Sequence, residues 1–205
     1  MELVEKSIDI FRQSVADYHR TDNVDTPATN PYAEGTIENS LYMKSWIDTV
    51  QWHLEDIIRD PGIDAVRALA IKRRIDRSNQ ERTDLVERID SWFLERFAGV
   101  KMQPDATINT ESPAWAIDRL SILVLKIYHM QIESVRPDST DAQRVACSAK
   151  LSVLNEQLAD LSEAISQLLD DMETGRKYMK VYRQMKMYND PSLNPVLYSR
   201  NAVRK

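Results

Sequence analysis

Polar residues interrupt an apolar line in the middle of the chain. Within residues 71–93, apolar side chains recur every three or four residues, except that Ser78 and Arg82 occupy two of the positions. Asp76 and Asn79 flank these two residues. A buried guanidinium group needs a carboxylate partner, to which it can donate two parallel hydrogen bonds. We therefore expect Arg82 to bind a carboxylate inside the fold, or alternatively to extend past the helix edge into solvent.

A second group of charged residues lies on the most apolar segment of the sequence, residues 110–130. At about 100° per residue, its apolar side chains cover most of the circumference, which is typical of a helix buried among other helices. The remaining arc holds Asp118, Arg119, Lys126 and His129. Because buried charges must be paired, these residues predict a polar seam inside a helical core.

The residue types in these segments and in residues 36–59 fit the binding of a small anion. Arginine and lysine side chains could bind a phosphate group, carboxylates and Asn79 could orient them, and Trp52 could stack on a ring. The alternative is a closed network of salt bridges that only fixes the register of the helices. The candidate ligand-binding or polar-core residues are Trp52, His53, Glu55, Asp56, Arg59, Asp76, Asn79, Arg82, Asp118, Arg119 and His129.

Metal chemistry is a second hypothesis, and carboxylates are its candidate ligands. Convergent carboxylates could hold Mg²⁺ for the hydrolysis of a phosphoester or a pyrophosphate. The candidates are Glu55, Asp56, Glu87, Asp90 and Asp118. The histidines His19, His53 and His129 lie on three different predicted helices without an HxxxH or ExxH pair, so their spacing does not predict a zinc site. Cys147 has no neighbouring histidine, and the chain has no glycine-rich phosphate loop.

Five helices are expected to position these residues. The predicted ranges are 2–20, 36–59, 64–98, 112–135 and 140–175. Thr36 and Ser112 are suited to cap the second and fourth helices, and Gly175 is expected to break or bend the fifth. After this glycine, residues 176–188 are predicted to continue as a helix, and Pro191 and Pro195 then predict extended structure.

The fifth helix carries the most regular pattern in the chain. Eight apolar positions alternate at intervals of four and three residues, namely Cys147, Leu151, Leu154, Leu158, Leu161, Ile165, Leu168 and Met172. This pattern is typical of knobs-into-holes packing, either against the third helix or against a second copy of the protein. The predicted fold is an all-α, single-domain bundle of about five long helices with a coiled-coil-like seam. The bundle spans residues 1–189, and residues 190–205 form an extended C-terminal tail.

Composition and charge limit the classes of protein and of partner. The single cysteine fits a reducing compartment, and with no signal peptide and no apolar run of about 20 residues the expected location is the cytoplasm. Residues 176–205 hold eight Lys/Arg and one acidic residue, so they carry +7, whereas the rest of the chain carries −12. Such asymmetry can mark a segment that contacts a protein partner. Nucleic acid is not favoured, because cations and tyrosines at these spacings also occur in ordinary helix packing.

Several runs of the sequence resemble the bacterial family called domain of unknown function 4254. They are NPYAEGTIENSLY, WIDTVQWHLEDIIRD, KRRIDRSNQERTDLVERID, INTESPAWAIDRLSILVLKIYHM and KMYNDPSLNPVLY, and together they cover nearly the whole chain. Ala114 departs from the glycine that more distant members have after the proline. The residues that match the family are Trp52, His53, Glu55, Asp56, Arg59, Asp76, Asn79, Arg82, Asp84, Glu87, Asp90, Asp118, Arg119 and His129. The resemblance implies a helical protein without an established activity, in a setting near cell-envelope glycosyltransferases.

Three functions therefore remain open at this point. The favoured one is a binding or accessory protein whose polar Arg/Asp/His seam holds a small, phosphate-bearing anion. The alternatives are a metal-dependent phosphoester or pyrophosphate hydrolase, and a helical adaptor that contacts a protein through residues 176–205. A homo-oligomer is compatible with all three.

Overall fold

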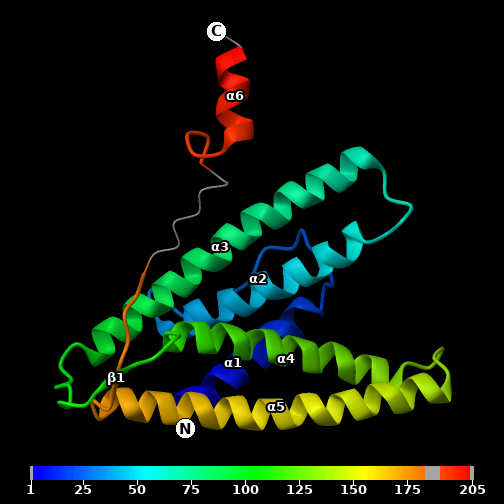
Figure 1. Cartoon of the computed structure of the whole chain (residues 1–205). Helices are drawn as coiled ribbons and strands as arrows, with labels where there is room; N and C mark the ends of the chain where they lie inside the picture. The colour runs from blue at the N-terminus through cyan, green and yellow to red at the C-terminus, as the bar shows by residue number, and fades with distance from the viewer. Residues whose placement is uncertain (1, 183–189, 204–205) are drawn as a thin grey trace.

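The computed structural model describes residues 2–182 and 190–203 of the chain, and six helices account for most of them. The helices are α1 (Glu2–Tyr18), α2 (Ile37–Ile58), α3 (Ala65–Phe97), α4 (Pro113–Val135), α5 (Asp141–Glu173) and α6 (Pro195–Val203). Two short strands, β1 (Thr107–Ile108) and β2 (Lys177–Tyr178), pair in parallel. The five long helices form one all-α bundle, which confirms the predicted fold class (Figure 1).

Local signals in the sequence determine where the helices begin. The side chains of Thr36 and Ser112 each accept a hydrogen bond from a backbone N–H of the first turn of α2 and α4, respectively. Pro113 fits the first position of α4, because the N–H that it lacks would have had no partner there. Thr140 and Gln143 form a reciprocal capping box at the start of α5. The predicted starts of these three helices are confirmed.

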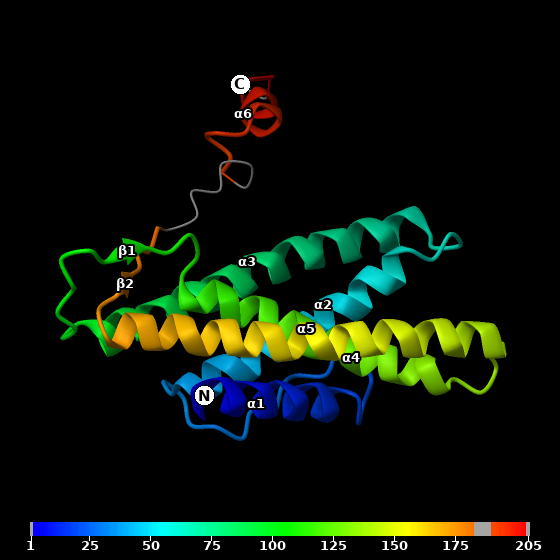
Figure 2. The same cartoon turned by 60° about the horizontal axis from the view of Figure 1, so that its bottom comes forward.

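Two helical hairpins and one covering helix make up the bundle. α2 packs against α3, α4 packs against α5, and α1 contacts both α2 and α4. They share one core, which includes Phe11, Trp46, Phe93, Leu120 and Ile165. Both views show α3 diverging from α5 towards the α2–α3 turn (Figures 1 and 2). Within the described residues, no helix combines the length and the apolar character needed to cross a membrane.

The main neighbour of α5 is α4, and the expected pairing with α3 is wrong. The connection between α4 and α5 spans only residues 136–140, and such a short connection makes consecutive helices fold back on each other. α3 approaches α5 near their C-terminal ends, where Arg96 forms an ion pair with Glu173. The apolar line of α5 is buried within residues 165–172 and only partly buried over residues 147–161.

The chain leaves helical geometry at Gly175, so the predicted helix over residues 176–188 is wrong for residues 176–182. Gly175 has a φ of +74°, and any side chain there would collide with the backbone of Lys101. This close approach lets the Gln103 N–H donate to the Gly175 carbonyl at 2.9 Å, beside the β1–β2 pair. Residues 183–189 lie outside the described part of the chain.

The C-terminal segment contains a helix where extended structure was predicted. Residues Pro195–Val203 form α6, whereas residues 204–205 lie outside the description. Proline at the first helical position and Asn194, whose Oδ1 accepts from the Val196 N–H at 3.0 Å, start this helix. Of the two prolines that suggested an extended tail, Pro195 therefore marks a helix start, whereas Pro191 lies in the preceding turn.

Candidate functional site

Four charged side chains from three helices meet in the centre of the bundle, and with Ser121 they form what we call the central ion network. Lys44 Nζ lies 2.7 Å from Asp118 Oδ1 on α4, and it also pairs with Asp48, one turn further along α2. The Arg82 guanidinium of α3 lies 2.8 Å from Asp118 Oδ2 and 3.1 Å from Asp48 Oδ1. Ser121 Oγ donates to Asp48 Oδ2 at 2.7 Å. Arg82 therefore has the buried carboxylate partner that its position in the sequence requires.

The central ion network balances its own charge. Lys44 has no exposed surface, both carboxylates are buried, and 28% of the Arg82 side chain is exposed. Burial raises the pKa of Asp48, while the positive charges of Lys44 and Arg82 lower it. Two cations and two carboxylates hold one another, so the network fixes α2, α3 and α4 relative to each other and presents no net charge to a ligand.

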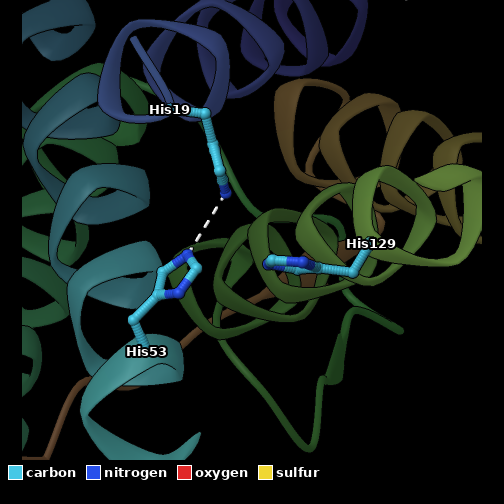
Figure 3. A group of neighbouring side chains, drawn as sticks. All are labelled: His19, His53 and His129. Carbon is cyan, nitrogen blue, oxygen red and sulfur yellow. Dashed lines mark hydrogen bonds between the residues drawn. The ribbon is translucent and has the colours of Figure 1, made fainter. Parts of the chain in front are cut away.

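A second polar group, which we call the histidine cluster, contains all three histidines of the chain. Figure 3 shows His19, which follows α1, His53 of α2 and His129 of α4 converging from three directions. One ligand nitrogen from each ring lies within 4.8 Å of the other two, and His19 Nε2 lies 3.2 Å from His53 Nε2. With metal–nitrogen bonds of about 2.0–2.1 Å, two ligands of a tetrahedral ion are about 3.3 Å apart, so this spacing suits a shared metal ion.

His53 and His129 are held in the neutral form that metal ions bind. His19 Nδ1 lies 2.7 Å from the Val15 carbonyl oxygen, to which it donates, and this leaves the lone pair on Nε2. Burial lowers the pKa of His53, and the neighbouring His19 lowers it further. The pKa of His129 is lowered to about 4, first by burial and then by His19 and His53. In the metal-free protein His53 Nε2 donates to the lone pair of His19 Nε2 at 3.2 Å, so an ion bound by both nitrogens requires the other neutral tautomer of His53.

Aromatic rings hold the histidine cluster in place. Trp52 stacks on His129, with 4.7 Å between ring centroids and an angle of 5° between planes. Tyr18 stacks on His53 at 5.0 Å. The sequence suggested that Trp52 could stack on a ring, and in the structure this ring is that of His129 on α4.

Two carboxylates lie at the edge of the histidine cluster. Asp22 Oδ1 lies 3.8 Å from His53 Nε2, and its side chain is 63% exposed. The charge of Asp56 raises the pKa of both His53 and His129, which opposes the effect of burial. Asp56 also lines a pocket of about 470 Å³ together with Trp52, so this pocket adjoins the cluster.

The other candidate residues lie outside both groups. They form surface ion pairs, namely Arg59 with Glu55 and Asp56, Asp76 with Lys72, and Arg119 with Glu111. Asn79 Oδ1 accepts a hydrogen bond from Gln51 Nε2 at 2.9 Å, which links α3 to α2. The prediction of a single polar seam thus included several residues that lie in surface ion pairs.

The carboxylates proposed as magnesium ligands are not brought together. Asp118 is occupied by Lys44 and Arg82, and the buried Asp90 bonds with Ser112, near the start of α4. Of the described residues, the three histidines form the one group of three or more potential ligands that converges. A metal site therefore calls for imidazole ligands, which the sequence analysis did not favour.

Four members of these groups were missed as site residues, namely Lys44, Asp48, Ser121 and His19. Lys44 was not singled out, although Asp48 four residues later is the spacing at which a helix pairs opposite charges. His19 was identified only as an isolated histidine, because helical periodicity relates residues of one helix and says nothing about which residues of two helices meet. No signal in the sequence could have joined His19 to His53 and His129.

Comparison with known proteins adds one match. A family model described as "Protein of unknown function (DUF4254)" matches residues 38–181. This range includes the whole central ion network as well as His53 and His129, whereas His19 precedes it. No curated protein and no solved structure gives a significant match.

Proposed function

This chain belongs to the DUF4254 family, whose description assigns no activity, and we propose that it binds one divalent transition-metal ion through His19, His53 and His129. An ion held by these three rings would lower the pKa of a bound water and so supply a nucleophile for the hydrolysis of a small substrate. The observation that carries this proposal is the convergence of every histidine in the chain, from three separate elements, onto one point.

The number and type of ligands favour a catalytic over a structural ion. Structural zinc sites are closed by four protein ligands, whereas catalytic sites have three protein ligands and a water molecule in the fourth position. A zinc ion bound in this way lowers the pKa of its water to about 7, which supplies hydroxide at neutral pH. The pocket lined by Trp52, Asp56 and Arg59 has room for a small molecule, and its Trp52 stacks on His129 of the cluster.

Zinc titration by calorimetry of the full chain tests the metal site. We expect one Zn²⁺ per chain, and a single substitution of His53 or His129 by alanine should weaken binding more than about 100-fold, since even outer ligand partners contribute about 10–100-fold. Tyr128→Phe is the matched control, because Tyr128 contacts the His19 ring but has no ligand nitrogen. Equal zinc affinity in the wild type and in His53→Ala would eliminate the site.

Hydrolysis is tested separately, with p-nitrophenyl esters of acetate and phosphate as probes. The zinc-loaded wild type should release p-nitrophenol faster than the metal-free protein, and His53→Ala should not. If zinc binds with the expected stoichiometry and no probe is hydrolysed, the ion holds α1, α2 and α4 together and the hydrolytic part of the proposal fails.

We also propose a second candidate function, the binding of a small anion, which a different surface supports. A groove of about 690 Å³ between α3, α4 and α5 is lined by the cations Arg82, Arg119 and Lys126, by the carboxylates Asp118 and Asp160, and by apolar residues of α4 and α5. Arg82 is neutralised by Asp48 and Asp118, and Arg119 pairs with Glu111, so Lys126 would provide most of the attraction.

A thermal-shift series with inorganic phosphate, AMP and glucose 1-phosphate tests the groove. A rise in Tm that Lys126→Ala abolishes would support anion binding there. The absence of any shift with all three probes would remove this candidate and leave the metal proposal unaffected.

A further inference from the structure

Asp22 has an unusual backbone conformation directly beside the histidine cluster. Its φ is +46°, and it is the one residue other than glycine with a positive φ within the described residues. The conformation ends α1, since the Asp22 N–H donates to the Tyr18 carbonyl at 3.0 Å. Glycine or asparagine would adopt this conformation at a lower cost than aspartate, so the backbone alone does not explain a carboxylate here.

The carboxylate of Asp22 is too far away to ligate an ion held by all three rings, yet it lies close to the edge of the histidine cluster. Asp22 Oδ1 lies 3.8 Å from His53 Nε2, but no oxygen of Asp22 belongs to the group of ligand atoms that lie within 4.8 Å of one another. A carboxylate at this distance suits a hydrogen bond to a molecule in the fourth position of the ion. The Asp22 side chain is 63% exposed, so water reaches this edge of the cluster.

From this geometry we infer that Asp22 accepts a hydrogen bond from the molecule in the fourth coordination position of the metal. This hydrogen bond favours water in that position over anions that carry no proton. The inference rests on the proposed metal site. A water molecule offers a proton to the carboxylate, whereas an anion such as thiocyanate offers none and is repelled by the negative charge. An ion held by the three rings would therefore keep its bound water in the presence of such an anion.

The test uses the full chain loaded with Co²⁺, whose visible absorption reports the ligands of the ion, and titrates it with thiocyanate. Asp22→Asn removes the charge and keeps a residue that readily adopts positive φ, so the end of α1 is preserved. Since two unit charges about 4 Å apart interact by about 1 kcal/mol even in water, the variant should bind thiocyanate at least about fivefold more tightly. Asp25→Asn, which removes the same charge from the same loop, should leave the affinity within about twofold, because Asp25 pairs with Arg74 and not with the cluster.

Each of the other results overturns a distinct statement. Equal thiocyanate affinity in the wild type and in Asp22→Asn would remove the role of Asp22 and leave the metal site intact. A tenfold loss of Co²⁺ affinity in Asp22→Asn, with a changed spectrum in the absence of thiocyanate, would make Asp22 a direct ligand and contradict the inference. If the wild type binds no Co²⁺, the metal proposal itself falls, and the role of Asp22 falls with it.

Discussion

At His129, burial and two neighbouring imidazoles act in the same direction, and the pKa falls from 6.5 to about 4. The charges of Asp56 and Asp22 oppose this shift but do not cancel it. His129 Nε2 has no hydrogen-bond partner among the described residues. A partly buried imidazole that is kept neutral beside two others lowers the stability of the metal-free protein, and its neutral form is the one that binds a metal ion.

The shifted pKa of His129 predicts acid sensitivity of the metal-free protein. Between about pH 6.5 and pH 4 the unfolded chain binds a proton at His129 and the folded chain does not, so the free energy of unfolding falls as the pH decreases. In His129→Gln we expect this dependence to be weaker by up to about one proton. Urea denaturation in EDTA across this pH range measures the slope, and identical slopes in the two proteins would refute the assignment.

Single residues also show how far the sequence could be interpreted. Arg82 was predicted to need a buried carboxylate because a guanidinium on an apolar line has few other options, and Asp118 fulfils this need. The convergence of His19, His53 and His129 could not be predicted, because it depends on how three helices are rotated about their axes. The sequence thus shows that a polar residue needs a partner, whereas tertiary packing determines which residue that partner is.

Among the helices, α2, α3 and α4 are joined by the central ion network, and Lys44 contributes its most buried charge. Without Lys44, the carboxylates of Asp48 and Asp118 would share the single cation Arg82. Breaking a buried ion pair by removing one partner typically costs about 3–5 kcal/mol, so Lys44→Met should lower the free energy of unfolding by that amount.

Urea denaturation provides the measurement, with two further variants as controls. Lys72→Met removes a lysine with the same four-residue spacing to its carboxylate, Asp76, but on the surface, so we expect a loss below about 1 kcal/mol. The double variant Lys44→Met/Asp118→Asn should lose less free energy of unfolding than the two single variants lose together, because the carboxylate that Lys44→Met leaves in excess is removed. A cost for Lys44→Met as small as that for Lys72→Met would show that the network does not hold the helices together.

The helix starts could be predicted and the helix partners could not, for the same physical reason. Thr36, Ser112 and Thr140 cap helices through hydrogen bonds to residues three positions away, which the sequence displays directly. The heptad line of α5 shows which face is apolar but not which element covers it. α4 covers that face, because the short loop between the two helices makes them pack side by side as antiparallel neighbours.

On the scale of the whole molecule, a bound ion would join α2, α4 and the end of α1 at one point. Zinc at about 100 times its Kd should therefore stabilise the fold by about 2.7 kcal/mol, which corresponds to a rise in Tm of about 5–10 °C for a chain of this size. Scanning calorimetry with zinc and then with EDTA measures the shift and its reversal. The same rise in His53→Ala would mean that zinc acts elsewhere.

The C-terminal segment offers a test of the adaptor hypothesis. Both views place α6 apart from the five long helices (Figures 1 and 2), and four of the eight cations after Gly175, namely Arg183, Lys186, Arg204 and Lys205, lie outside the described residues. Deleting residues 183–205 should change Tm by less than about 2 °C, because surface changes usually alter stability by no more than about 0.5 kcal/mol. Zinc stoichiometry should also be unchanged. A large drop in Tm would make this segment part of the bundle and not a site for a partner.

Anomalous diffraction at the zinc absorption edge, from crystals of the zinc-loaded full chain, tests the central claim most directly. The account predicts one strong peak at about 2.0–2.1 Å from a ring nitrogen of each of His19, His53 and His129. A fully loaded crystal with no peak among these three rings would contradict it.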